Sequence, residues 1–129
     1  MSSAGPAAGG LRLGKARPRS AVLRTALLVL LAERDSHGYD LAPRLASLGL
    51  AVDMAGVYRA LRAMERRGEL RSTWDTSSSQ GPPRRVYGLT EAGRRLIRPA
   101  VAGMEAQSLA LGSLLAHCRR AGLAARPDR

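Results

Sequence analysis

The chain has 129 residues, the length of one domain or of one domain with an added arm, and its 21 basic and 10 acidic side chains give a net charge of +11. Phe is absent and Trp occurs once, so a core must be built from Leu, Val, Ala and Met. Lys15 is the only lysine, and Arg supplies a planar donor fork that suits phosphates and guanine edges. This excess favours a nucleic-acid partner, with an arginine-rich composition of solvated side chains as the alternative.

The composition also excludes several kinds of site. Cys118 is the only cysteine, which rules out an intrachain disulfide and a cysteine-based metal cage and fits a reducing cytoplasm. The apolar run 26–32 is too short to span a bilayer and no signal peptide is visible, so we expect a soluble cytoplasmic protein with no membrane partner. No glycine loop for phosphate, activated nucleophile or carboxylate pair indicates an enzyme, and we expect no cofactor and no metal.

The N-terminal part of the chain predicts an arm followed by a buried helix. Residues 1–19 lack acidic side chains and hydrophobic periodicity, which predicts a disordered basic arm. Ser20 is placed to cap a helix over residues 21–34 that is apolar on nearly every side. A helix without a polar face needs cover on most sides, so we expect a second chain or another long helix to pack against it.

Residues 35–38 predict a turn that leads into a second helix, from Tyr39 to Leu48. Pro43 lies early in this helix, where proline is least disruptive. The predicted inner face consists of Leu41, Leu45 and Leu48.

A third helix is predicted between Asp53, a good N-cap, and Gly68, a good C-terminal stop. At about 100° per residue its apolar side chains gather on one side and its arginines on the other. The apolar side consists of Val57, Ala60, Leu61 and Met64, and the outer side of Ala55, Arg59, Arg62 and Arg66. Two helices joined by a tight turn, the second basic on its outer side, predict a helix-turn-helix.

Alternating residues 70–75 and 84–89 predict two strands joined by a polar loop, and a hairpin directly after a helix-turn-helix is a wing. We expect Trp74 to pack against Tyr87 within it. Arg84 and Arg85 alternate across the returning strand, so only one points directly at a minor groove while the other meets phosphate or solvent.

Thr90 is placed to cap a final helix, for which we expect a kink or break near Pro99. Side chains recur along it at intervals of four and three residues, the spacing of a coiled-coil seam. This seam consists of Ile97, Val101, Met104, Ser108, Leu111, Leu115 and Cys118. Residues 119–129 predict a flexible tail.

The order of three helices, a wing and a C-terminal helix resembles the PadR family of bacterial winged helix-turn-helix regulators. Three segments carry the resemblance: HGYDL at 37–41, VYRAL with its following Met-Glu and Gly at 57–68, and GPPRRVY with LTEAG at 81–93. The resemblance covers about residues 20–118, and the short C-terminal part is similar to the compact subfamily.

The resemblance implies a mostly α fold with a small β-hairpin, in which a winged helix-turn-helix domain (20–89) precedes a C-terminal dimerisation helix (90–118). It further implies a homodimer in which this helix packs on the partner's first helix, and a small-molecule effector as a further partner. An aromatic sandwich for that effector is unavailable in the final helix, which has no aromatic residue. The expected dimer residues are Val22, Leu23, Leu27 and Leu30 with the seam Ile97, Val101, Met104, Ser108, Leu111, Leu115 and Cys118.

The expected contacts to double-stranded DNA come from the helix-turn-helix and the wing. They are Tyr39, Ala55, Gly56, Tyr58, Arg59, Arg62, Arg66, Arg84 and Arg85. Arg59 and Arg62 suit base edges, with a solvated arginine face as the alternative, and Arg66 suits phosphate or the helix dipole. Tyr58 either bonds a phosphate or packs half-buried with its hydroxyl in water.

These patterns predict a sequence-specific transcriptional regulator, a homodimeric repressor of a pseudo-palindromic operator, located in the cytoplasm at the nucleoid. The alternative from another class is a helical protein-interaction module that has only non-specific affinity for DNA.

Overall fold

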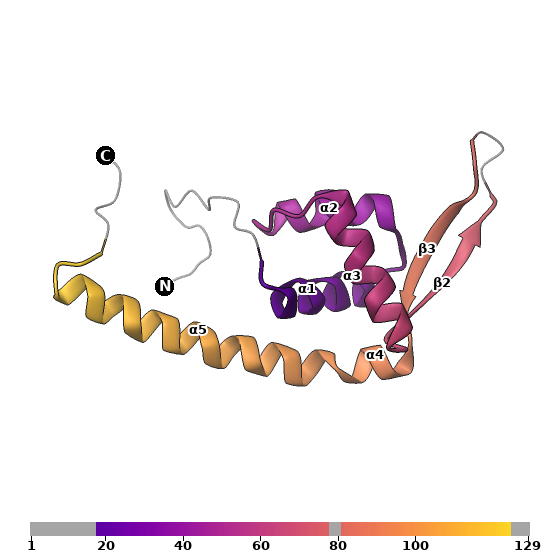
Figure 1. Cartoon of the computed structure of the whole chain (residues 1–129). Helices are drawn as coiled ribbons and strands as arrows, with labels where there is room; N and C mark the ends of the chain where they lie inside the picture. Colours follow the sequence, from indigo (N-terminus) through magenta and orange to yellow (C-terminus); the bar gives the residue numbers. More distant parts are fainter. Residues whose placement is uncertain (1–17, 78–80, 125–129) are drawn as a thin grey trace.

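A computed structural model describes residues 18–77 and 81–124 of the chain (Figure 1). The elements are α1 (Ser20–Glu33), β1 (Ser36–His37), α2 (Gly38–Ser47), α3 (Met54–Arg66), β2 (Leu70–Asp75), β3 (Arg84–Leu89), α4 (Glu91–Arg95) and α5 (Ile97–Arg120). The fold is mostly helical with a small antiparallel sheet, as predicted. Residues 1–17 of the predicted arm and 125–129 of the predicted tail lie outside the described residues.

The core lies where the first three helices meet the inner end of the sheet. Its buried members are Leu27, Leu28, Leu30, Leu31, Leu41, Leu45, Val57, Leu61, Met64, Leu70, Tyr87 and Leu89. Burying an aliphatic or aromatic side chain stabilises a fold by roughly 1.5–3 kcal/mol, so this cluster supplies most of the driving force. The cover that α1 requires comes largely from its own chain, because α2, α3, β3, α4 and α5 all pack against it.

The second helix differs from its prediction at the end. Leu48 was expected on the inner face, but its side chain is 52% exposed. The helix ends at Ser47, and the chain reverses through Gly49, whose φ of +82° is accessible to glycine at little cost. This reversal carries Leu48 away from the core.

The sheet contains a strand that the sequence pattern did not predict. Residues 35–38 were expected to form a turn, but Ser36 and His37 pair antiparallel with Tyr87 and Val86 of β3. The strand order is therefore β1-β3-β2, and β3 lies in the middle with β2 on its other side. A two-residue strand has no alternation to detect, so only the partner strand reveals it. Through this pairing, backbone hydrogen bonds join the wing to the residues that directly precede α2.

Two of the three predicted helix caps are confirmed. The Asp53 carboxylate accepts a hydrogen bond from the Gly56 N–H at 2.7 Å, and the Thr90 hydroxyl accepts one from the Gly93 N–H at 3.1 Å. The predicted stop at Gly68 has a φ of +78°. Ser20, however, is the first residue inside α1, and Arg19 at the N-cap position makes no side-chain cap bond. That prediction is wrong by one residue.

A buried carboxylate connects α1 to the turn before β2. Glu69 is 5% exposed and accepts hydrogen bonds from Arg24 Nε at 3.0 Å, Arg24 Nη2 at 2.5 Å and Arg67 Nε at 2.9 Å. Burial by itself raises the pKa of Glu69, but the bonds and charges of the two arginines outweigh burial and hold this pKa below its ordinary value. Glu69 is therefore ionised in the folded chain at neutral pH.

The short helix α4 packs against the same turn. The Thr90 hydroxyl donates to the Gly68 carbonyl at 2.6 Å, and the Thr90 N–H donates to the Glu69 carbonyl at 3.1 Å. Gly93 lies so close that a Cβ atom added there would overlap the Glu69 carbonyl oxygen. The absence of a side chain at Gly93 is thus a requirement of the packing.

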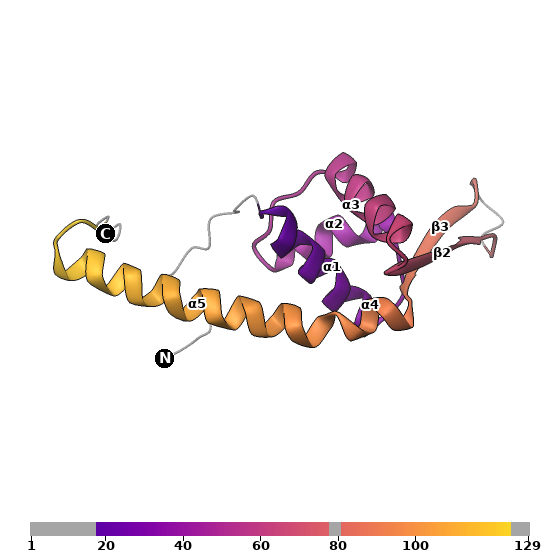
Figure 2. The same ribbon diagram turned by 60° about the horizontal axis from the view of Figure 1, so that its bottom comes forward.

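The break in the last helix lies at Leu96, between α4 and α5, close to the position expected from Pro99. This places Pro99 in the first turn of α5, where an N–H has no helical partner and its absence costs little. The helix runs on to Arg120, two residues into the predicted tail. It extends away from the rest of the chain in both views (Figure 1, Figure 2), and Figure 2 shows α3 and α5 on opposite sides of α1. Within residues 18–77 and 81–124, no helix is long and apolar enough to cross a membrane.

Candidate nucleic-acid interface

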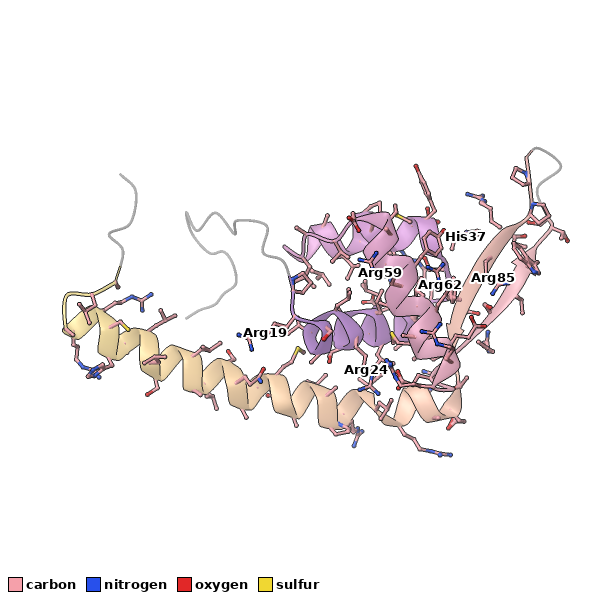
Figure 3. All side chains as sticks on the ribbon, in the orientation of Figure 1. Arg19, Arg24, His37, Arg59, Arg62 and Arg85 are labelled. Carbon is pink, nitrogen blue, oxygen red and sulfur yellow. The ribbon has the colours of Figure 1, made fainter. Side chains whose placement is uncertain are left out.

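The third helix presents its arginines outward, as the sequence pattern predicts. Val57, Leu61 and Met64 are buried on its inner side, whereas Arg59 and Arg62 are exposed on its outer side (Figure 3). Arg66 is also exposed, and none of these three guanidinium groups forms an ion pair with a residue that the structure describes. A row of unpaired guanidinium groups on a rigid helix is a ready set of donors for phosphates and base edges.

The first turn of this helix is compact on its outer side. Ala55 is exposed, and Gly56 lies against the Asp53 carboxylate that caps the helix. A Cβ at Gly56 would lie 3.0 Å from Val52 and 3.1 Å from the Asp53 carboxylate, so the cap itself favours glycine there. The same two small residues leave the outer surface of the turn without a large side chain.

A groove of about 700 Å³ separates α3 from the wing. It gathers all four aromatic residues of the chain and three of its arginines, from both sides of the groove. Its lining consists of His37, Gly38, Tyr39, Tyr58, Arg62, Trp74, Pro83, Arg84, Arg85 and Tyr87. Flat apolar faces beside guanidinium groups match the alternation of sugar and phosphate along a nucleic-acid backbone.

The two tyrosines that were predicted as DNA contacts lie at this groove in different environments. Tyr39 is 64% exposed at the start of α2. Tyr58 is half-buried, and its ring lies across Gly38, where an added Cβ would be 2.6 Å from Tyr58 Cε1. Tyr58 therefore fastens α3 to the start of α2 through its ring. This agrees with the half-buried packing considered for it, and its position in the groove lining leaves a phosphate contact open.

The two wing arginines have different surroundings. Arg84 is exposed, whereas Arg85 lies 4.7 Å from the centre of the Trp74 ring and donates to the Ser72 hydroxyl at 3.2 Å. Arg85 Nη1 is also 3.7 Å from Glu65 Oε1 on α3. Arg85 thus connects the wing to α3, and Arg84 is the more exposed of the two.

Trp74 does not pack as predicted. It was expected against Tyr87, but it is 61% exposed, and the guanidinium of Arg85 covers one face of its ring. Tyr87 is 2% exposed in the core, and burial raises the pKa of its phenol. The register explains the difference, because Trp74 is opposite Arg85 while Tyr87 is opposite Ser72.

Sequence reasoning missed a side-chain contact between the wing and α2. His37 Nε2 lies 2.9 Å from Asp75 Oδ2, and His37 Nδ1 lies 3.6 Å from Asp40 Oδ2. The Asp75 carboxylate also accepts from the Ser77 hydroxyl at 2.6 Å and the Ser77 N–H at 2.9 Å. These Ser77 bonds, together with the His37 bond, lower the pKa of Asp75 to about 2. Thirty-eight positions separate His37 from Asp75, so no local pattern could indicate their contact.

The residues predicted at a dimer interface fall into three groups. Leu27 and Leu30 are 0% and 5% exposed inside this chain, so they are core residues and offer no surface to a partner. This corrects their prediction; the reason is that the chain itself covers α1. Half-buried positions are Val22, Leu23, Ile97, Val101, Met104 and Cys118, and exposed positions are Ser108, Leu111 and Leu115.

The outer half of α5 has several large apolar side chains exposed on its surface. No residue of α5 is buried, and its large exposed side chains are Leu109, Leu111, Leu114 and Leu115. Leu111, Leu114 and Leu115 share one side of this helix and form a patch of the kind that marks a protein contact, whereas Leu109 faces the other side. The described part of the chain contains no cluster of three His, Cys, Asp or Glu residues that could hold a metal ion.

Comparison with solved structures finds the same architecture in several bacterial proteins. A PadR family transcriptional regulator from Eggerthella lenta is 31% identical, with a TM-score of 0.59, and the match covers 73% of this chain and 86% of that one. A PadR-like transcriptional regulator from Bacillus cereus is 25% identical, with a TM-score of 0.64, and the match covers 73% and 91%. PadR from Bacillus subtilis, solved in complex with operator DNA, is 19% identical, with a TM-score of 0.57, over 62% of this chain and 46% of that one.

Among curated protein sequences, none is significantly similar to the chain. The family model of the PadR-like transcriptional regulators matches residues 27–99, from the middle of α1 to the first turn of α5. This segment contains the helix-turn-helix, the wing and the joint at Leu96, and it amounts to more than half of the chain. The chain therefore belongs to the PadR-like family of transcriptional regulators.

Proposed function

We propose that this protein binds double-stranded DNA as a homodimer and represses transcription from a pseudo-palindromic operator. One observation carries the proposal: Arg62 of α3 and Arg84 of β3 line a single groove, so the helix and the wing can contact the same DNA duplex with their cations. The Bacillus subtilis protein that was solved with operator DNA shares this fold. The family to which the chain belongs consists of transcriptional regulators.

In this proposal α3 enters a major groove. Arg59 and Arg62 lie in its N-terminal and middle turns and contact base edges, while Arg66 near its end contacts phosphate. Ala55 and Gly56 allow the first turn to approach closely. The Tyr39 and Tyr58 hydroxyls bond phosphates at the start of α2.

The wing contributes contacts that tolerate many sequences. Arg84 is exposed at the beginning of β3 and reaches the neighbouring minor groove or its phosphates. Arg85 has a smaller share in binding, because Trp74, Ser72 and Glu65 already surround its guanidinium.

The proposed dimer forms through α5. Its exposed leucines and the half-buried positions Val22 and Leu23 of α1 form the contact with the second subunit. The two recognition helices would then read half-sites about 34 Å apart, one turn of the duplex. A small molecule that binds between the subunits would release the DNA by changing this distance, and the protein would act at the nucleoid in the cytoplasm.

The test has two parts. Selection from a random duplex library, followed by anisotropy titration against competitor DNA, measures whether one sequence is preferred. Light scattering coupled to gel filtration measures the subunit number. A palindromic preference together with a dimer is the expected result. A monomer without preference for any duplex refutes the proposal.

A second candidate is a helical protein-interaction module with only non-specific DNA affinity, and the exposed leucines of α5 favour it. It predicts a stable monomer that pairs with another protein through α5. The same light-scattering measurement separates the two, because the first candidate requires the pure chain to dimerise.

A further inference from the structure

The contact between His37 and Asp75 holds the outer part of the wing, which the backbone pairing of β1 with β3 does not reach. The β1–β3 pairing comprises only Ser36 and His37, opposite Tyr87 and Val86. Beyond this pairing, the hairpin of β2 and β3 continues to its outer end, where Asp75 is opposite Arg84. His37 Nε2 reaches the Asp75 carboxylate across 2.9 Å, so a single side chain ties this outer end to the N-cap position of α2.

The partners of the Asp75 carboxylate determine which of the two side chains carries the hydrogen of this bond. Asp75 accepts bonds from the Ser77 hydroxyl and backbone N–H as well as from His37, and its pKa of about 2 keeps the carboxylate ionised. An ionised carboxylate only accepts hydrogen bonds, so His37 Nε2 carries the hydrogen. The two side chains are 21% and 27% exposed, and this partial exclusion of water strengthens the bond.

The same contact determines what lies beside Arg84. Arg84 is the antiparallel partner of Asp75, and a carboxylate and a guanidinium at opposite positions of a hairpin can form an ion pair. Three donors occupy the carboxylate instead, and Arg84 forms no ion pair within residues 18–77 and 81–124. His37 and Arg84 also line the groove between α3 and the wing.

We propose that His37 is a positioning residue for DNA binding. Its bond to Asp75 fixes the outer end of the wing at the angle at which Arg84 and Arg62 face one duplex. This inference rests on the proposed function, because it assigns the role of His37 through the arginines that contact DNA.

The replacement Asp75→Ala tests the proposal, because a pure charge effect and a positioning effect change the affinity for DNA in opposite directions. Removing a negative charge from a basic surface should tighten DNA binding if charge alone matters. If Asp75 acts by holding His37, the same replacement should weaken binding by about 2- to 10-fold, the equivalent of one hydrogen bond. The probe is a fluorescently labelled duplex of mixed sequence, because phosphate contacts do not depend on the operator.

The companion variants identify the bond itself. His37→Ala should weaken binding as Asp75→Ala does, whereas Asp75→Asn keeps an acceptor for Nε2 and should bind at least as tightly as the native chain. His117→Ala changes the other histidine, which is exposed on α5, and should leave affinity unchanged. Trp74, the only tryptophan and the neighbour of Asp75, should show altered emission in the free Asp75→Ala protein.

A double-mutant cycle separates positioning from general damage. In an Arg84→Ala background, His37→Ala and Asp75→Ala should cost little further affinity, because the arginine that they position is gone. Full additivity, or an Asp75→Ala protein that binds the duplex more tightly, overturns the inference. If the native chain binds no duplex at all, the proposed function fails instead, and the two failures are thus distinguishable.

Discussion

Replacing Gly93 with alanine tests the packing of α4 against the Gly68–Glu69 turn. An alanine inside a helix is favoured over glycine by roughly 0.5–1 kcal/mol, so helix propensity alone predicts a gain in the free energy of unfolding. The structure predicts the opposite, because the new Cβ would overlap the Glu69 carbonyl oxygen. That oxygen belongs to the backbone and cannot rotate away, so α4 itself must move.

The magnitude follows from three contributions. Overpacking a tight contact costs about 1–3 kcal/mol, and moving α4 lengthens the hydrogen bond from the Thr90 N–H to the Glu69 carbonyl, which is worth about 1 kcal/mol. Subtracting about 1 kcal/mol for the better helix former leaves a net destabilisation of about 1–3 kcal/mol for Gly93→Ala.

Urea unfolding followed by circular dichroism measures this change, with all variants at one protomer concentration because the proposed dimer would contribute to stability. Gly103→Ala is the matched control, since Gly103 lies in α5 with open space around the added Cβ. It should be as stable as the native chain or more stable by roughly 0.5–1 kcal/mol. A Gly93→Ala protein that matches this gain would refute the argument from close approach.

Three further predictions concern the interface, the buried carboxylate and the helix α5. Arg62→Ala should weaken operator binding by about 1–3 kcal/mol, whereas Arg98→Ala, an equal loss of charge on exposed α5, should cost much less in the same anisotropy titration. Glu69→Gln should lower stability at neutral pH by about 1–2 kcal/mol, because both arginine partners are partly exposed. Since the pKa of Glu69 is lowered on folding, its contribution is present above the ordinary carboxyl value of 4.5 and is lost as the pH falls below it. Acid unfolding should therefore be shallower in the variant, and equal pH profiles would contradict this assignment. Leu111→Asp should convert the proposed dimer to a monomer in light scattering, whereas Ser113→Asp should not. If both variants are dimers, the contact between the subunits lies elsewhere.

The parts of the fold that depend on local chemistry were predictable from the sequence. Asp53 and Gly68 bound α3 because capping and left-handed glycine act within a few residues of the helix ends. The division of α3 into a buried side and a basic side follows from the helical periodicity of about 100° per residue, and its arginines are exposed on the side that this periodicity predicts. The wing strands β2 and β3 match their predicted residues for the same reason.

The parts that depend on distant partners were not predictable. The pairing of β1 with β3 and the bond between His37 and Asp75 require the folded sheet before either has a partner. Trp74 was misplaced because its neighbour is decided by the register of the hairpin, which brings Arg85 opposite it. Leu27 and Leu30 of α1 were assigned to a partner because the pattern shows how much surface must be covered but not which chain covers it.

The joint at Leu96 has a mechanical consequence for the proposed dimer. From this joint α5 extends 24 residues, about 36 Å, and α3 lies on the other side of α1. A tilt of roughly 10° at Leu96 would displace the far end of such a lever by about 6 Å, nearly two base-pair steps of a duplex. In the proposed dimer, the separation of the two α3 helices would thus be governed by the few side chains that hold Leu96 and Ile97 against the core. Small repacking at this pivot would be amplified into a mismatch between the dimer and its operator.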